Sequence, residues 1–208
     1  MAKVKICGIT NLDDALAAIE CGADAVGFIF ASSPRQVTTS EVREIVSKVP
    51  PFVCKVGVFI DGEIAQVRDT MSFCNLDLAQ LHGDEGLDYC AALSPRVIKV
   101  FTIESLPSGQ DLSRYPVVAY LLDGTKGTAM SDTEQQQLWQ LAHDIGEHGP
   151  VILAGGLTPE SVGEAIEVAN PYAVDVSSGV EAEPGKKDHR KLLAFIAAAK
   201  NARPGGQR

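Results

Sequence analysis

The sequence predicts an α/β protein built as one domain, a closed (β/α)8 barrel of the TIM type. Eight short apolar segments alternate with segments of helical pattern, and the whole series fits within 208 residues. The apolar segments are nearly continuous runs rich in β-branched residues, as expected for parallel strands that are covered on both faces. These predicted strands lie at about 3–7, 24–30, 52–59, 76–81, 97–102, 117–123, 151–154 and 172–177.

Seven segments, six between these strands and one after the last, have the spacing of apolar residues that is typical of helices. The first begins at Asn11, which is a good N-cap, and a later one has Thr158 as its cap and Pro159 as its first residue. The segment 104–115 is too rich in Pro, Gly and Ser for a long helix. The predicted helices lie at about 11–21, 39–48, 61–72, 84–93, 134–145, 159–169 and 188–200.

The same alternation is compatible with an open, doubly wound sheet. A dinucleotide-binding sheet of that kind would carry a G-x-G-x-x-G turn after its first strand, whereas this chain has Cys7-Gly8-Ile9-Thr10 there. This turn and the number of strands favour the closed barrel. We expect residues 1–200 to form the catalytic domain and residues 201–208 to be a frayed tail.

Composition and charge restrict the partners and the compartment. The net charge of −9 argues against nucleic acid and anionic membranes, since both require a basic surface. The N-terminus has no apolar stretch long enough for a signal peptide. The cysteines are odd in number and form no C-x-x-C pair, so we expect no disulfide framework, no metal site and a cytoplasmic location. Monomer and homodimer are equally compatible with the sequence. The cysteines are Cys7, Cys21, Cys54, Cys74 and Cys90.

The C-terminal ends of the strands form the active-site face of such a barrel, so the residues there are the candidates for function. The ends of the last two strands carry glycine-rich turns, Gly155-Gly156 and Ser177-Ser178-Gly179. Many barrels bind phosphate at this place through backbone N–H groups, so we expect a phosphorylated small molecule, although the glycines could simply permit tight turns. The other candidate side chains are Cys7, Arg35, Gln80, His82, Asp123 and Asp175.

The motifs at these strand ends resemble those of the phosphoribosylanthranilate isomerase family of tryptophan biosynthesis. They are KICGIT, SSPR, QLHG, LLD, LAGGL and AVDVSSGVE followed by PGKKD, in the order of that family, and the resemblance runs from about residue 3 to residue 200. It implies an Amadori rearrangement of N-(5-phosphoribosyl)anthranilate to 1-(2-carboxyphenylamino)-1-deoxyribulose 5-phosphate, with no cofactor and no metal. It also implies that Cys7 is the general base and Asp123 the general acid.

These residue types suit that chemistry. Opening the furanose ring requires a proton on the ring oxygen, which a protonated Asp123 can donate, and burial at the barrel mouth favours the protonated form. Ring opening produces a protonated Schiff base that acidifies the C2′ hydrogen, so that the Cys7 thiolate is a sufficient base. The planar fork of Arg35 matches the anthranilate carboxylate. The remaining candidates for contacts with the substrate are Gln80, His82 and Asp175, of which Asp175 could instead orient the thiol.

The chain departs from the family pattern after Asp123. The family carries a Gly-Gly-Thr/Ser-Gly turn and a Phe-Asp-Trp-like helix start, whereas residues 124–132 read GTKGTAMSD. Lys126 and Ala129 occupy positions that the family fills with glycine, and Trp139 comes too late to replace the aromatic segment. Because glycine lets a loop change conformation as it closes, we expect residues 125–133 to be the most mobile part of the rim and activity or specificity to be altered.

Two other functions stay open. The first is a different phosphosugar barrel enzyme, an epimerase or a lyase, which would usually need paired carboxylates, a metal site or a catalytic lysine such as Lys55 or Lys99 in the strands. The second is a catalytically weakened barrel that serves as a subunit of a pathway complex, which only the altered loop favours. Loss of the anthranilate substrate's fluorescence on turnover would separate the three functions.

Overall fold

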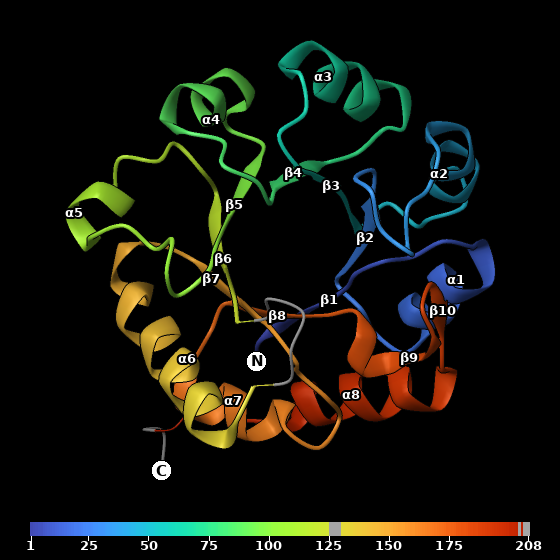
Figure 1. The fold of residues 1–208 in the computed structure, drawn as a ribbon. Helices are drawn as coiled ribbons and strands as arrows, with labels where there is room; N and C mark the ends of the chain where they lie inside the picture. The colour runs from blue at the N-terminus through green and yellow to red at the C-terminus, as the bar shows by residue number, and fades with distance from the viewer. Residues whose placement is uncertain (125–129, 204, 206–208) are drawn as a thin grey trace.

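Eight parallel strands close into a barrel in the computed structural model, which describes residues 1–124, 130–203 and 205. Each strand pairs with the next along the chain, and the last pairs with the first (Figure 1). Lys5 and Asp175 are register partners at this closure. The predicted fold class is confirmed, and the open sheet is excluded. The strands are β1 Lys3–Ile6, β2 Ala25–Ile29, β3 Cys54–Phe59, β4 Leu78–Leu81, β5 Val97–Phe101, β6 Ala119–Asp123, β7 Val151–Ala154 and β8 Ala173–Val176.

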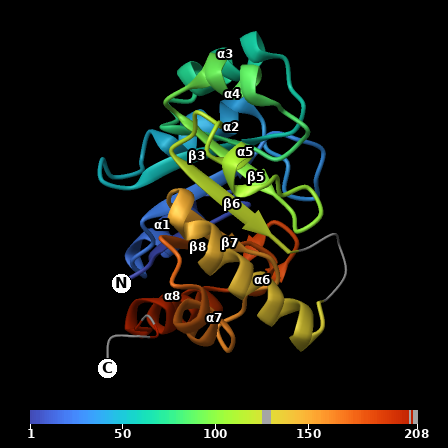
Figure 2. The same ribbon diagram turned by 90° about the vertical axis from the view of Figure 1, so that its left-hand side faces the viewer.

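The helices lie around the outside of the barrel, as the side view in Figure 2 also shows. The side chain of Asn11 caps the first of them by accepting a hydrogen bond from the backbone of Asp14 at 2.8 Å, as predicted. No helix in the described part of the chain is long and apolar enough to span a membrane. The α-helices are α1 Leu12–Glu20, α2 Thr39–Val46, α3 Ile64–Phe73, α4 Leu87–Leu93, α5 Gly109–Leu112, α6 Asp132–Ile145, α7 Val162–Ala169 and α8 His189–Asn201.

Several predicted boundaries differ from the structure by two or three residues, and two of these differences have clear local reasons. Helix α7 begins at Val162 rather than at Pro159, because Thr158 caps a preceding turn, in which its hydroxyl accepts from the backbone of Ser161 at 3.3 Å. Strand β3 begins two residues later than predicted, and Phe52 before it is 99% exposed. The proline pair before Phe52 offers no N–H donors to a strand ladder.

Three further sequence features are the segment 104–115, the position of Trp139, and the loop and tail that were expected to be mobile. The segment 104–115 contains only the four-residue helix α5, as expected. Trp139 lies in α6 and is buried in the core between helix and barrel. The expectations for the loop at 125–133 and for the frayed tail fall largely on residues 125–129, 204 and 206–208, which lie outside the described residues.

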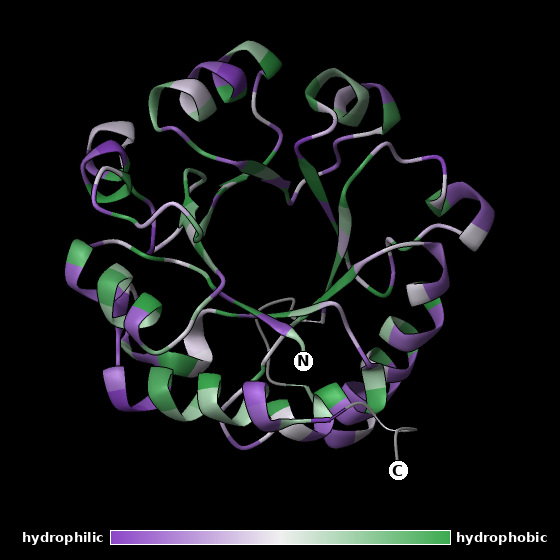
Figure 3. Cartoon of the chain, turned by 180° about the vertical axis from the view of Figure 1, so that it is seen from behind, coloured by the Kyte–Doolittle hydropathy of each residue, from purple (hydrophilic) through white to green (hydrophobic). Residues whose placement is uncertain are grey.

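The core has two separate parts. The larger part fills the space between the barrel and the helices. Hydrophobic and hydrophilic residues alternate along these helices (Figure 3). The smaller part fills the barrel lumen with side chains that alternate along the strands, so that residues two apart share the inner face. This apolar filling leaves the polar inner residues near the C-terminal ends of the strands. The lumen residues are Val56, Ile98, Val100, Ala119, Leu121, Ile152, Ala154 and Ala173.

Candidate active site

A cavity of about 250 Å³ opens at the C-terminal ends of the strands. All eleven residues that the sequence nominated line it, and they come from the ends of six strands. A larger cavity, of about 620 Å³, lies between α3 and α4 at the other end of the barrel and contains none of them. The eleven are Cys7, Arg35, Gln80, His82, Asp123, Gly155, Gly156, Asp175, Ser177, Ser178 and Gly179.

Cys7 follows β1 directly, and its thiol is buried at the top of the lumen. A Cβ at Gly27 of the neighbouring strand β2 would lie 2.9 Å from the Cys7 sulfur, so that only glycine leaves room for the thiol. Burial raises the pKa of Cys7, and the positive charge of Lys5 opposes that rise. Sequence reasoning missed Lys5, although its spacing of two from Cys7 places both on the same face of the strand.

Asp123 ends β6 beside β7, and His82 reaches it from the loop after β4. The His82 Nε2 atom lies 3.5 Å from Asp123 Oδ2. Gly155 approaches the same carboxylate with a φ of +95°, and a Cβ there would lie 2.4 Å from the backbone nitrogen of Gly124. The close backbone approach and the positive φ both require glycine at this position.

The glycine-rich turns after β7 and β8 pack directly against each other. A Cβ at Gly179 would lie 1.9 Å from the carbonyl oxygen of Leu157, and Gly156 has a φ of +67°. Ser178–Val180 forms a short 3-10 helix that follows the serine turn. The two turns therefore lie against each other along one side of the cavity. Glycine-rich turns of this kind can bind an anion through their backbone N–H groups.

Three buried polar atoms of the cavity have no hydrogen-bond partner among the residues that the structure describes. They are Gln80 Oε1, Asp175 Oδ1 and Ser177 Oγ. Buried polar groups are nearly always paired in folded proteins, so an unpaired group that faces a cavity calls for a ligand. The three atoms belong to three of the nominated residues, and they would suit the hydroxyl and phosphate groups of a polar ligand.

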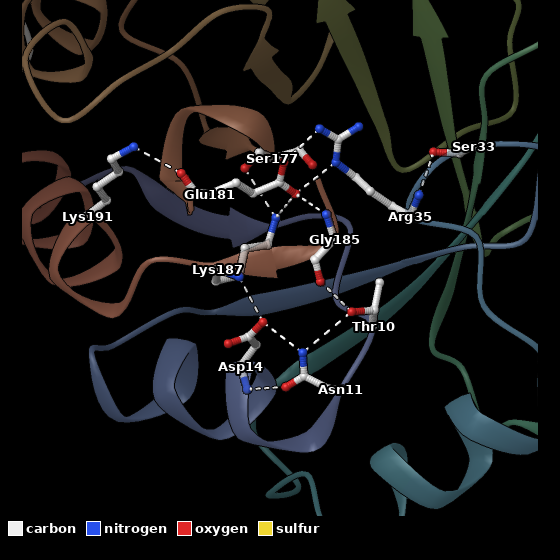
Figure 4. Close-up of polar contacts among 10 residues, drawn as sticks. All are labelled: Thr10, Asn11, Asp14, Ser33, Arg35, Ser177, Glu181, Gly185, Lys187 and Lys191. Atoms are coloured by element: carbon white, nitrogen blue, oxygen red, sulfur yellow. Dashed lines mark hydrogen bonds and ion pairs between the residues drawn. The ribbon is translucent and has the colours of Figure 1, made fainter. Parts of the chain in front are cut away.

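Arg35 is held in place by an ion pair with Glu181 (Figure 4). Its Nε and Nη2 atoms donate to the two oxygens of Glu181 at 2.8 and 2.7 Å. The sequence predicted that the guanidinium would bind a substrate carboxylate with a bidentate edge, and the edge formed by Nε and Nη2 is instead used by Glu181. A ligand would therefore meet the edge formed by Nη1 and Nη2. The ion pair fixes the plane of the guanidinium before a ligand arrives.

Glu181 also anchors Lys187, which is fully buried. The ammonium of Lys187 donates to Glu181 at 2.9 Å and to the carbonyl oxygen of Ser177 at 3.2 Å. Burial raises the pKa of Glu181, but hydrogen bonds from Arg35 and Lys187 lower it by more, so that the net pKa lies below its usual value. Sequence reasoning assigned no role to Glu181 or Lys187, although both stand in the motif after the last strand.

Lys55 and Lys99 lie outside the cavity lining. Lys99 donates to Glu85 at 3.0 Å and to the carbonyl oxygen of Gly83 at 2.6 Å, and Lys55 pairs with Asp77 at 2.8 Å. Both ammonium groups are thus engaged by structural partners, which argues against the lysine chemistry of the alternative lyase function.

Comparisons with known proteins all point to one family. A sequence model of the family "N-(5'phosphoribosyl)anthranilate (PRA) isomerase" matches residues 4–198. The N-(5'-phosphoribosyl)anthranilate isomerase of Geobacter metallireducens is 50% identical over 201 residues, which cover 96% of this chain and 100% of that relative. The crystal structure of phosphoribosyl anthranilate isomerase from Thermus thermophilus has a TM-score of 0.83 at 38% identity and covers 97% of this chain and 100% of that one.

A second solved structure is a complex with a ligand. It is a phosphoribosyl anthranilate isomerase in complex with reduced 1-(o-carboxyphenylamino)-1-deoxyribulose 5-phosphate, with a TM-score of 0.82 and 41% identity. The match covers 96% of this chain and 99% of that chain. By the extent of the family match and the identity to these relatives, the chain belongs to the N-(5'-phosphoribosyl)anthranilate isomerase family.

Proposed function

We propose that this chain isomerises N-(5-phosphoribosyl)anthranilate to 1-(2-carboxyphenylamino)-1-deoxyribulose 5-phosphate, a step of tryptophan biosynthesis. The observation that carries the proposal is that one cavity joins a thiol, a carboxylate, an arginine and two glycine-rich turns at the active-site end of a (β/α)8 barrel. These groups match the three parts of the substrate, which are the reacting sugar carbons, the carboxylate and the phosphate.

Asp123 and Cys7 divide the proton transfers between them. Asp123 gives a proton to the ring oxygen, the C1′–O bond breaks, and the nitrogen lone pair forms a protonated Schiff base. The Cys7 thiolate then takes the C2′ proton, and the electron pair of that bond neutralises the iminium to give an enolamine. Protonation at C1′ and loss of the hydroxyl proton at C2′ complete the ketone, so that no net proton is gained or lost.

The two ends of the substrate would be held by the groups that flank this pair. Phosphate fits the turns Gly155-Gly156 and Ser177-Ser178-Gly179, whose backbones approach the cavity closely. The anthranilate carboxylate fits the outer edge of Arg35, which Glu181 orients. The unpaired oxygens of Gln80 and Asp175 would face the sugar hydroxyls.

Turnover of N-(5-phosphoribosyl)anthranilate tests this function directly. The purified chain should remove the fluorescence of the anthranilate substrate at catalytic concentration, and chromatography should show stoichiometric product. A Cys7→Ser variant that binds the product but does not form it is the matched control. Binding without turnover in the parent chain would favour the weakened barrel, and no binding would favour another phosphosugar enzyme.

The compartment belongs to the same proposal. A reducing cytoplasm suits the five free thiols, of which Cys7 is needed in its reduced form. Fractionation of the source cells should place the activity with the cytoplasmic enzymes of amino-acid biosynthesis. Recovery of the activity in the membrane fraction would contradict this placement.

A further inference from the structure

We propose that Lys5 is a positioning residue that stabilises the thiolate form of Cys7, in a buried cluster that it forms with Asp175 and the thiol. The inference rests on the proposed role of Cys7 as the base. It assigns a function to a residue that lies outside the cavity lining and beneath the reacting groups.

The position of Lys5 is fixed by the barrel itself. Lys5 and Asp175 are register partners on β1 and β8, and the ammonium donates to Asp175 Oδ2 at 2.9 Å. Only 3% of Lys5 is exposed, so solvent screens this charge little. Cys7, two residues later, shares its face of the strand, and the positive charge of the ammonium acts on its thiol.

Gly27 on the neighbouring strand lets the two groups meet. A Cβ at this position would lie 2.9 Å from the sulfur of Cys7 and 3.1 Å from Cε of Lys5. Ala25, two residues earlier on β2, packs against the lumen cluster, so position 27 also faces inward. Because Gly27 has no side chain, it leaves the space in which the thiol and the ammonium approach each other.

The charges around the thiol explain why such a partner is needed. Burial raises the pKa of Cys7, and the nearby Asp175 raises it further, whereas Lys5 and Lys187 lower it. The net pKa lies above that of a free thiol, and it would lie higher still without Lys5. The guanidinium of Arg35 also interacts with the thiol of Cys7 by charge. The remaining titratable residues of the same cavity are His82 and Asp123.

Lys5 is suited to this role because it stays charged. Burial lowers its pKa, but the charges of Asp175 and Cys7 raise the pKa by more, so that the net value lies above that of a free lysine. Asp175 thus secures the charge on Lys5, and Lys5 in turn stabilises the thiolate. Lys99 is also buried, but its ammonium donates to Glu85 and to two backbone carbonyl oxygens outside the cavity lining.

The pH dependence of Cys7 alkylation tests the proposal without substrate. Labelling with iodoacetamide over a pH series that extends to about pH 11 is measured at the Cys7 peptide by mass spectrometry, because the pKa of Cys7 is already raised. Lys5→Met should raise the midpoint by about one pH unit or more, which lowers the labelling rate below the midpoint about tenfold. Lys5→Arg should keep the midpoint near that of the parent, because it restores the charge. In turnover, Lys5→Met should lower kcat with little change in KM.

Controls separate charge from damage to the fold. Lys55→Met is the control for loss of a lysine. Lys55 lies on β3, two strands away from β1, and its ammonium pairs with Asp77 outside the cavity, so this variant should leave the Cys7 midpoint unchanged. Lys5→Gln replaces Lys5→Met if the latter does not fold, since its amide can still donate to Asp175. An unchanged midpoint in the folded Met or Gln variant, or an equal shift in Lys5→Arg, would overturn the proposal. Because alkylation needs no substrate, a shifted midpoint in a chain without isomerase activity would refute the proposed function alone.

Discussion

Cys7 and Asp123 carry different halves of the proposed proton transfer, and each can be changed with little loss of volume. We predict that Cys7→Ser and Asp123→Asn each lower kcat by about 10²- to 10⁴-fold, the usual effect of removing a general acid or base. Circular dichroism and the unfolding temperature should stay close to those of the parent. Near-parental kcat in either variant would contradict its assignment.

Arg35 is predicted to act in binding rather than in the chemical step. Arg35→Ala should raise KM for the carboxylated substrate more than it lowers kcat, because the contact exists in the ground and transition states alike. Arg114→Ala is the control, since the side chain of Arg114 is 66% exposed and pairs with the surface residue Asp111. Steady-state kinetics on both variants check this prediction. An unchanged KM in Arg35→Ala would contradict the proposed contact between Arg35 and the substrate carboxylate.

Residues at the strand ends could be predicted from the sequence because their signal is local. A polar residue or a glycine directly after an apolar run marks the C-terminal end of a strand. All eleven residues found in this way line one cavity. Glu181 could not be found so, because its contact with Arg35 spans 146 residues. Lys5 lies in a strand that reads as alternating, KVKIC, in which a lysine resembles a solvent-facing residue until the barrel closes.

At the scale of elements, the ends of helices and strands were less predictable than their existence. Apolar runs overestimate strands, because a residue such as Phe52 matches the pattern but follows two prolines and points to solvent. The hairpin of β9 Glu181–Glu183 and β10 Lys186–Lys187 was not predicted, since three and two residues are too short for periodicity to show. Its place depends instead on long-range bonds, including one from the backbone of Lys187 to Asp14 at 2.8 Å.

The β9–β10 hairpin gives a prediction for the pH dependence of stability. Glu181 has a pKa lowered below its ordinary 4.5, so its ionised form stabilises the fold above that pH, and this stabilisation is lost as the pH falls through the lower folded pKa. Glu181→Gln should therefore cost about 3 kcal/mol at pH 7, because it leaves Lys187 buried without its carboxylate. The difference from the parent should shrink below pH 4.5.

Urea unfolding at a series of pH values measures this difference. Glu183→Gln on the same hairpin is the matched control, since its ion pair with Lys186 is 3.9 Å long and both side chains are about two-thirds exposed. That variant should change the free energy of unfolding by less than about 1 kcal/mol at every pH. A pH-independent loss in Glu181→Gln would mean that packing, and not charge, holds the hairpin.

The whole molecule is a closed barrel, and closure explains why its fold was the easiest property to predict. Eight parallel strands in one ring need apolar side chains on both faces, and this need shows in the sequence as near-continuous apolar runs. The division of those side chains between lumen and outer layer depends on the register, which no local pattern fixes. The lumen cluster therefore became visible only in the structure.

The lumen cluster leads to a prediction about global stability. Leu121 is 1% exposed and packs inside the barrel, two residues before Asp123 on β6. Leu121→Ala should lower the free energy of unfolding by about 3 kcal/mol, because the surrounding ring of strands cannot collapse into the space that the side chain leaves. Leu193→Ala on the outer face of α8, where the leucine is 58% exposed, should cost less than about 0.5 kcal/mol. Urea unfolding of the two variants against the parent decides the matter, and equal losses would show that the lumen does not carry the stability of the barrel.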